Sequence, residues 1–563
     1  MADEIEFAKK YTYSVSVYHD EAGDLGAAEL SFGAQQWPSV AFKDLKSYTK
    51  ANAVGLGRTV KAKANDGTVF SLFNCQLTEF SLHADYVIVG DVEERFKAIE
   101  IRFSEVSEWF YRWQRVKGRP GRAIRWVNRA DHWNVTVDSG EETFRLYTES
   151  MASIKEAGED CICHEHVEFG LESLGTPFSA DDVHRKALDI AALLAILIAY
   201  PISVVSAHVV CENGRSYGIY FPSFQRVERE HDDRGFWLRC FISKEMLDDK
   251  IQVVAERFFA SEFRKVTWAR LAGMQRYDSF WEYKALGYVS LLDGYVTERA
   301  RGRQQPPATL PEKRARNFVE ALKRVREPLT ESQQEQLLTI ANDVFSNKRE
   351  FSFSENLDFM LESVDANVRK IINLSNADFS QIKFIRNKVA HGADLELASR
   401  DFTRIHIVIA KIRLLLTYWA FLDFGLTGAD FIQCFTQNHS PLHMEADVDR
   451  IHLDRVTNAA TFFTVSRAQF ERLSQIRGIR ANACFVMDVD GSIEYSPEHT
   501  EAYAKWIFGP DRKGGRIPVE EIFEVEVSRI ESKGHVYIEC GDDRLELSCV
   551  HIIKPGAQEE MDG

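Results

Sequence analysis

The sequence predicts an α+β multidomain protein with a β-rich N-terminal region, an all-α helical bundle and a small C-terminal α/β module. The chain has 563 residues, of which 45% are hydrophobic, and this length is too great for one hydrophobic core. Short alternating segments dominate the first part, and apolar residues recur at helical spacing in the middle. We expect a β-rich domain over residues 1–245, a helical connector over 246–278, a bundle over 279–435 and a module over 440–563.

The N-terminal region is predicted to consist of short strands around one helix. Residues 11–175 contain segments in which β-branched and aromatic residues alternate with polar ones, and such a run predicts a sandwich or a partly closed barrel. Ser179 and Asp182 have the spacing of a capping box, which predicts a helix from there to about residue 200. Three further strands are expected, near residues 203–211, 216–221 and 236–242.

Helical periodicity defines the middle of the chain. A helix is expected from about Phe280 to Gly302, followed by a basic, Pro-rich stretch over residues 299–326 and by helices that begin near Thr330 and Ser354. The helix over 401–424 is apolar around most of its circumference. Such a helix needs burial on more than one side, which we expect a bundle and a dimer partner to provide.

The last 120 residues predict a small α/β module. Strands are expected near 483–488, 492–496, 522–529, 535–540 and 544–550, and helices near 465–476 and 499–507. Asp488 to Gly491 reads as a hairpin turn, because the other ligands of a calcium loop are missing.

Composition limits the surroundings and partners of the chain. The formal net charge is −16, so any RNA-binding site must be a local basic patch. Nine scattered cysteines and the lack of a leader pattern predict a cytoplasmic protein without structural disulfides. The longest apolar run, residues 187–201, is shorter than the ~20 residues of a membrane span, so we expect a buried helix and no membrane segment.

Residues 384–392, F-I-R-N-K-V-A-H-G, contain the main candidate site. Arg386 and His391 stand five positions apart at the end of a predicted helix, and Gly392 suits a left-handed helix end. The same spacing occurs at Arg226 and His231, but those residues lie among acidic residues in a strand-rich region. The predicted helix before Arg386 and His391 therefore favours this pair as the candidate site.

With Asn387 after the arginine, this segment resembles the R-N-x-x-x-H motif of HEPN-domain ribonucleases. More closely, residues 5–430 resemble the ApeA-like group of HEPN proteins, which join a β-rich N-terminal region to a HEPN bundle and take part in bacterial abortive-infection defence. The resemblance implies a dimeric bundle whose two motif helices face each other, with Arg386, Asn387 and His391 as catalytic residues.

The motif residues suit RNA cleavage without a metal or cofactor. A histidine can move protons near neutral pH, and an arginine can neutralise the phosphorane oxygens. Five residues turn an ideal helix by about 500°, so Arg386 and His391 point about 140° apart. Either the helix breaks at Gly392, or the site is completed across a two-fold axis. The alternative is structural: Arg386 caps or forms a salt bridge, and His391 ends the helix.

Three other segments are candidate sites. Residues 110–126 interleave aromatic rings with basic residues, which suits binding of single-stranded RNA; the alternative is a solvated β-hairpin or helix end with inward aromatic rings. The candidate RNA-binding residues there and in the motif are Arg112, Arg115, Arg119, Arg122, Lys383 and Lys388. Cys161, Cys163, His164 and His166 are possible zinc ligands, but alternation along a strand separates the cysteines from the histidines. The basic stretch at 299–326 can also contact RNA.

The preferred hypothesis is a metal-independent, homodimeric endoribonuclease of antiphage defence. It would cleave RNA, plausibly tRNA, into 2′,3′-cyclic phosphate products after a phage-derived trigger acts on the β-rich domain. One alternative is a non-catalytic HEPN protein that binds RNA or a partner. Another is a β-rich receptor for carbohydrate or peptide that the bundle merely dimerises.

Overall fold

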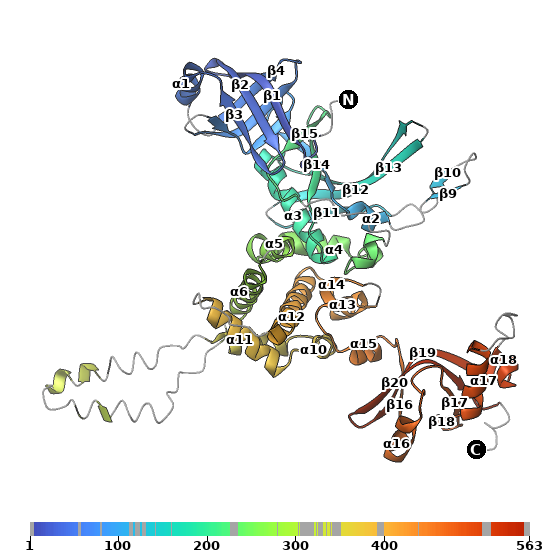
Figure 1. The fold of residues 1–563 in the computed structure, drawn as a ribbon. Coiled ribbons are helices and arrows are strands. Elements are labelled where there is room, and N and C mark those ends of the chain that lie inside the picture. Colours follow the sequence, from blue (N-terminus) through green and yellow to red (C-terminus); the bar gives the residue numbers. More distant parts are fainter. Residues whose placement is uncertain are drawn as a thin grey trace. The chain divides into compact units, whose positions relative to one another are not determined.

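The computed structural model describes most of the chain and divides it into two compact units, residues 1–447 and 448–563 (Figure 1). The described residues are 5–54, 58–78, 81–111, 116–118, 124–126, 131–140, 142–158, 160–225, 235–277, 280–301, 303, 320–321, 324, 330–333, 335–337, 339, 351–390, 399–436, 439–508 and 519–556.

Six strands at the N-terminus close into a barrel. The sheet runs β5-β4-β1-β2-β3-β6, and β6 pairs back onto β5, so no open edge is left there. This closed barrel decides between the two predicted β architectures. The strands are β1 (Lys10–His19), β2 (Gly23–Gly33), β3 (Gln36–Phe42), β4 (Arg58–Ala64), β5 (Val69–Leu77) and β6 (Ser81–His83), with helix α1 (Leu45–Val54) beside them.

The same sheet continues beyond the barrel as an antiparallel extension. From β5 it runs β7-β15-β14-β8-β13-β12-β11. Its strands are β7 (Tyr86–Val89), β8 (Phe96–Phe103), β11 (Asn134–Asp138), β12 (Thr143–Ala157), β13 (Asp160–Ser173), β14 (Val204–Cys211) and β15 (Ser216–Tyr220). Helix α2 (Val106–Tyr111) and a separate hairpin of β9 (Val116–Gly118) and β10 (Ile124–Trp126) connect β8 to β11.

Helix α3 (Ala180–Ile198) is the buried helix that the sequence predicted. Ser179 caps it in a capping box with Asp182, which confirms the predicted start. The helix packs on β8 and β14 and also contacts α5 (Ala269–Arg276) and α12 (Ser399–Asp423). Contacts on both sides explain why the run from Ala187 is apolar almost throughout.

The predicted strand at 236–242 is wrong. Residues Phe236–Arg239 form a short 3-10 helix, η1, which follows Gly235 at a φ of 62°. Phe236, Phe241 and Ile242 are all fully buried. Trp237 and Leu238 are partly buried and Arg239 is exposed, so this short run shows neither the period of a strand nor that of a helix.

A helical connector leads from the sheet to the bundle. It consists of η2 (Lys244–Met246), α4 (Ile251–Ala260), a π-helical turn η3 (Arg264–Trp268) and α5. The bundle then contains α6 (Trp281–Arg299), α9 (Phe353–Glu362), α10 (Ala366–Ile372), α11 (Asn376–Ala390), α12, α13 (Gly428–Cys434) and α14 (Pro441–Met444). Helix α6 contacts α5, α9, α11 and α12.

The helix starts in the bundle follow capping chemistry. Thr330 and Gln333 exchange the expected capping hydrogen bonds. The N-cap of α9 is Ser352, not Ser354, because Ser352 forms a capping box with Glu355. Ser354 lies inside the first turn.

Helix α12 is buried within the single chain. Residues Phe402–Asp423 are long and apolar enough to cross a membrane by length and composition, but 78% of the most apolar window is buried inside the protein. Helices α3, α6, α10, α13 and α14 all contact α12. The bundle that we expected to bury this helix therefore supplies most of its cover, and the contribution of a dimer partner stays a prediction.

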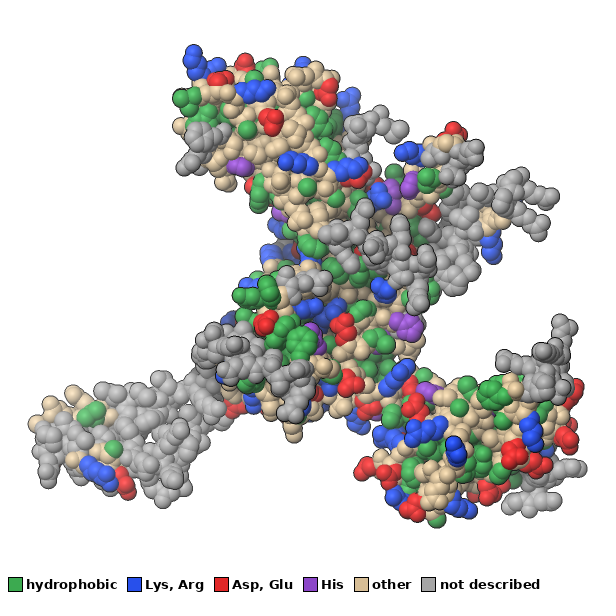
Figure 2. Space-filling model, in the orientation of Figure 1, with side chains coloured by type: hydrophobic (Ala, Val, Ile, Leu, Met, Phe, Trp, Pro, Cys, Tyr) green, Lys and Arg blue, Asp and Glu red, His purple; other side chains and the backbone are tan. Residues whose placement is uncertain are grey.

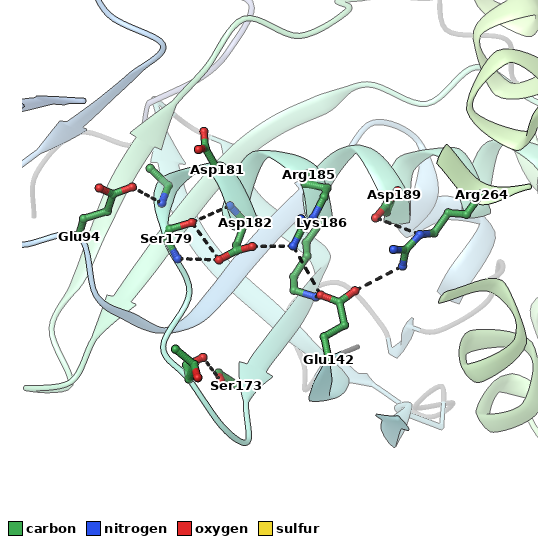
Figure 3. A network of polar contacts seen from close by, with 12 residues as sticks. Glu94, Glu142, Ser173, Ser179, Asp181, Asp182, Arg185, Lys186, Asp189 and Arg264 are labelled. Atoms are coloured by element: carbon green, nitrogen blue, oxygen red, sulfur yellow. Dashed lines mark hydrogen bonds and ion pairs between the residues drawn. The ribbon is translucent and has the colours of Figure 1, made fainter. Parts of the chain in front are cut away.

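Buried ion pairs join the β-sheet extension to the connector (Figure 3). Glu142 lies directly before β12. Lys186 on α3 is 1% exposed and donates to Glu142 Oε2 at 2.8 Å. Arg264 on η3 is 5% exposed and donates to the other oxygen of the same carboxylate at 3.3 Å. Burial raises the pKa of Glu142, but Lys186 and Arg264 outweigh burial, so this pKa lies below its usual value. One carboxylate thus ties α3 and β12 to the connector.

The second unit is a small mixed sheet with helices. Its strands pair in the order β16-β19-β20-β17-β18, and Phe470 and Leu473 of α16 pack into its core. The elements are α15 (Arg450–Val456), β16 (Thr461–Thr464), α16 (Arg467–Gln475), β17 (Cys484–Met487), β18 (Ile493–Tyr495), α17 (Pro497–Phe508), α18 (Val519–Phe523), η5 (Val527–Arg529), β19 (Ile530–Cys540) and β20 (Asp543–Ile553).

Two sequence expectations in this unit have clear outcomes. Asp488 to Gly491 is the turn of the β17–β18 hairpin, as expected, with Gly491 N–H donating to the Asp488 carbonyl. The strand expected at 522–529 is wrong. Helix α18 ends at Phe523, Glu524 adopts a φ of 54°, and the exposed Val527 begins η5, so the alternating valines do not line a sheet.

Candidate active site at the end of helix α11

Helix α11 presents the motif because buried residues fix its orientation. Asp378 and Ser375 exchange capping hydrogen bonds at its start. Ile382 and Ile385, one turn apart, are fully buried against the bundle. Asn387, directly after Arg386, is exposed. The helix therefore turns Asn387 outward while Ile382 and Ile385 anchor it to the core.

A buried ion pair holds the other end of α11. Lys411 of α12 donates to Asp378 at 3.1 Å and to the carbonyl of Asn373 at 2.7 Å. Burial alone would raise the pKa of Asp378, but the Ser375 and Lys411 hydrogen bonds lower it below the usual value. Asp378 is therefore held charged, and α11 is fixed against α12 at the end opposite the motif.

Arg386 is held by two other helices. Its Nε and Nη2 lie 3.0 Å and 2.9 Å from the same oxygen of Asp293 on α6. Its guanidinium carbon lies 5.2 Å from the centre of the Phe353 ring on α9. The side chain of Arg386 remains 42% exposed, and that of Asp293 27% exposed. The guanidinium is thus oriented along one edge and still reaches solvent.

Two lysines accompany Arg386 on α11. Lys388 is exposed, whereas Lys383 is partly covered and its Nζ lies 4.2 Å from the centre of the Phe379 ring. Across the face in Figure 2, acidic and basic side chains are interspersed on the first unit. These three cations lie on one helix, but two positions turn an ideal helix by about 200°, so Lys388 projects away from the side of Arg386. Their contact with RNA stays a prediction.

Several predicted site residues lie outside the described residues. These are His391 and Gly392 of the motif, both members of the earlier pair Arg226 and His231, and the candidate RNA-binding residues Arg112, Arg115, Arg119 and Arg122. Their predicted roles stay predictions.

The aromatic residues beside the N-terminal basic segment are core residues where the structure describes them. Trp109, Phe110 and Tyr111 on α2 are buried. Lys117 and Arg125 are exposed on the β9–β10 hairpin. The hairpin alternative therefore fits this part of the segment, and Phe110 and Tyr111 are not available to stack on bases.

The cysteine and histidine segment belongs to strand β13. Cys163 pairs with Ile154, and His164 pairs with Ser153, so the two side chains lie on opposite faces of the strand. His166 lies 3.2 Å from Glu168. In the part of the chain that the structure describes, no group of three or more His, Cys, Asp or Glu residues can hold a metal. The side chain of Cys161 is not among those described.

The described part of the basic stretch at 299–326 is engaged with the bundle. Arg303 lies 3.9 Å from the centre of the Phe359 ring and donates to the Glu355 carbonyl at 3.2 Å. Arg299 packs over Phe263 of the connector, and Arg301 pairs with Glu298 at 2.7 Å. Of these three arginines, Arg303 contacts α9 and Arg299 contacts the connector, whereas Arg301 pairs with a residue of α6.

Sequence reasoning missed Asp293. A single acid stands between Leu292 and Gly294 in an otherwise apolar stretch of α6. Its spacing to Arg386 carries no signal, since 93 residues separate them. The only local indication was the presence of Asp293 in an apolar stretch, because an acidic residue that is partly buried in a helical bundle commonly has a basic partner.

Comparison with known families found a match for the β-rich region and another for the helical bundle of the first unit. Residues 57–257 match the family model for ApeA N-terminal domain 1, and residues 286–430 match the model for Apea-like HEPN. The motif and Asp293 both lie inside the second match. Searches of curated proteins and of solved structures found no match. HEPN domains are generally ribonucleases that dimerise and bind RNA, and this HEPN type points to antiphage defence. The chain therefore belongs to the ApeA-like HEPN proteins.

Proposed function

We propose that this protein is a metal-independent endoribonuclease of antiphage defence, which cuts RNA at Arg386, Asn387 and His391. The observation that carries the proposal is the setting of Arg386. Asp293 and the Phe353 ring orient its guanidinium, while 42% of the side chain stays exposed beside the exposed Asn387. An oriented cation that solvent reaches is what a phosphate-stabilising group requires.

The three motif residues supply the parts of transesterification. The 2′-hydroxyl oxygen attacks the adjacent phosphorus, its proton leaves, and the 5′-oxygen departs after accepting a proton. His391 transfers protons in this scheme, Arg386 neutralises the non-bridging oxygens, and Asn387 orients the phosphate. The products are a 2′,3′-cyclic phosphate and a 5′-hydroxyl.

The proposed active form is a homodimer with RNA across the two motif helices. Arg386 and His391 would point about 140° apart on one straight helix. An arginine from one protomer and a histidine from the other remove this conflict. The substrate that we propose is tRNA, whose exposed loops suit a single-strand nuclease, and the proposed compartment is the cytoplasm. In this proposal, a phage-derived trigger acts on the β-rich domain.

The test is RNA cleavage by wild type and by three single variants: Arg386→Ala, Asn387→Ala and His391→Ala. Purified protein is incubated with total RNA in EDTA, and the fragment ends are mapped. We expect cyclic-phosphate ends from wild type and a loss of about 100-fold or more for Arg386→Ala. If wild type is silent, the assay is repeated in extract from phage-infected cells. Equal cleavage by wild type and His391→Ala would refute the proposed site.

The ion pair between Arg386 and Asp293 also favours a second candidate, in which the motif arginine is structural. Under that candidate, the protein binds RNA or a partner without turnover. The pair is partly exposed, so its removal should cost at most about 1 kcal/mol of folding free energy. A structural arginine would therefore change thermal stability slightly and leave defence intact, whereas a catalytic one would abolish defence at nearly unchanged stability.

A further inference from the structure

The β12–β13 hairpin is much longer than the sheet that supports it. The two strands pair from Phe144 with Ser173 to Ala157 with Asp160. Strand β11 pairs with β12 only up to Tyr147, and β8 pairs with β13 only from Phe169 onward. Beyond these points no other described strand flanks the hairpin, and Figure 1 shows it projecting from the body.

The hairpin is anchored just outside the sheet. The hydroxyl of Tyr111 on α2 donates to the carbonyl of His166 at 2.9 Å and lies 2.7 Å from Ser150 Oγ. The ring of His132 lies 3.0 Å from the same serine oxygen. These contacts fix the direction in which the hairpin leaves the body. We call residues 151–165, beyond this anchor, the distal ribbon.

The distal ribbon exposes side chains on both faces. Every residue from Met151 to Glu156 and from Ile162 to His164 is exposed. Ile154, which is 70% exposed, pairs with the exposed Cys163 on one face, while Met151 and Ile162 are exposed on the other. Apolar side chains on both faces of a two-stranded ribbon bury almost nothing in this conformation.

A ribbon of this kind is poised for a further strand. An isolated two-stranded hairpin is only marginally stable in water, and an edge strand offers unpaired N–H and C=O groups to another chain. Natural edges are commonly protected by lysines, by proline or by a covering element. The distal ribbon has one lysine, Lys155, and no proline.

Charge selects the occupant. In the sequence of the distal ribbon, four acidic residues, Glu156, Glu159, Asp160 and Glu165, stand against Lys155; Glu159 and the side chain of Asp160 lie outside the described part. A second copy would place acids against acids, and RNA would place phosphates there, so both are disfavoured. We propose that the distal ribbon is a docking arm that binds another protein by accepting an extended, basic strand along its edge. Backbone hydrogen bonds and Ile154 provide affinity, and the acids select lysine- or arginine-bearing strands.

The test uses a defined probe with the full-length protein. A fluorescent peptide of about seven residues, with alternating valine and lysine, is titrated and followed by anisotropy. Two control peptides replace lysine by glutamate or carry N-methyl groups on alternate backbone nitrogens, which removes strand donors but keeps the charge. We expect the valine–lysine peptide to bind at least tenfold more tightly than either control.

Variants locate the binding to the ribbon. Replacing residues 152–165 by Asn-Gly keeps the anchor and should abolish peptide binding, and Ile154→Asp should weaken it about tenfold. Leu45→Asp is the matched control, because Leu45 on α1 is 71% exposed and lies outside the ribbon. Unchanged peptide binding by the shortened hairpin would overturn the proposal. Equal binding of the N-methylated peptide, or loss of the dimer or of RNA binding on shortening, would also overturn it.

Discussion

Asp293 should act on RNA cleavage only through Arg386. Arg386 Nε donates to one oxygen of Asp293 at 3.0 Å, and Nη2 forms an ion-pair contact with the same oxygen at 2.9 Å. In Asp293→Ala, the guanidinium loses these contacts and keeps only the Phe353 ring as a described neighbour. The perturbation therefore removes the orientation of the arginine and leaves its charge.

The expected magnitudes differ for stability and activity. Side chains that are 42% and 27% exposed form an ion pair worth at most about 1 kcal/mol, so the melting temperature should fall by less than about 4 °C. A misplacement of about 1 Å at a catalytic group can cost about 100-fold in rate. We expect Asp293→Ala to lose about 10- to 100-fold, and Arg386→Ala about 100- to 1,000-fold.

A double-mutant cycle measures whether the two residues act together. Cleavage rates are compared for wild type, Asp293→Ala, Arg386→Ala and the double variant, at matched protein concentration and with melting curves for each. We expect the double variant to cleave as slowly as Arg386→Ala alone. If the two losses multiply, Asp293 acts independently of Arg386, and the positioning role is refuted.

Three further predictions concern stability. Glu142→Gln should lower the free energy of unfolding by about 3–5 kcal/mol in urea titrations, because the buried Lys186 loses its charged partner, and adding Lys186→Met should recover part of it. Ser352→Ala should lower the free energy of unfolding by about 1 kcal/mol, because α9 loses its N-cap. A change smaller than the measurement error would count against a stabilising role of the capping box. The folded-state pKa of Asp378 is lowered, so its stabilising contribution is complete above about pH 4 and declines as the pH falls further. The pair of changes Asp378→Asn and Lys411→Met should therefore flatten the acid limb of a stability–pH curve.

Local signals predicted the elements whose chemistry is local. The capping box at Ser179 and Asp182 placed α3 correctly, and helical periodicity placed α6 and α12. Alternation predicted β1 and β5 of the barrel, but β2, β3, β4 and β6 were not singled out, and no local signal showed that β6 pairs back onto β5. The positions of the domain boundaries at 245, 278 and 435 stay predictions, although the family matches at 57–257 and 286–430 stand beside them.

Long-range features were missed for a physical reason. The distal ribbon escaped notice because its side chains bury nothing, so its sequence lacks the alternation that a covered face requires. The segment from Phe236 to Ile242 was misread as a strand, because periodicity does not separate a strand from a helix in so short an apolar run. Asp293 was missed because its partner stands 93 residues away. At the candidate site, the motif arginine and asparagine were predictable, and what orients them was not.

The position of Arg264 has a consequence for how parts of this protein can be exchanged. The family matches suggest two modules, of which the first ends at residue 257 and the second begins at residue 286. Arg264 lies between them, yet it pairs with Glu142 inside the first module. A hybrid that takes residues 258–285 together with a foreign bundle would lose Arg264 from this buried cluster of charges. Hybrid proteins should therefore fold only when the N-terminal module includes its own residues up to the end of α5. The N-terminal module and the connector must therefore be exchanged together, because Arg264 of the connector balances the charge of Glu142.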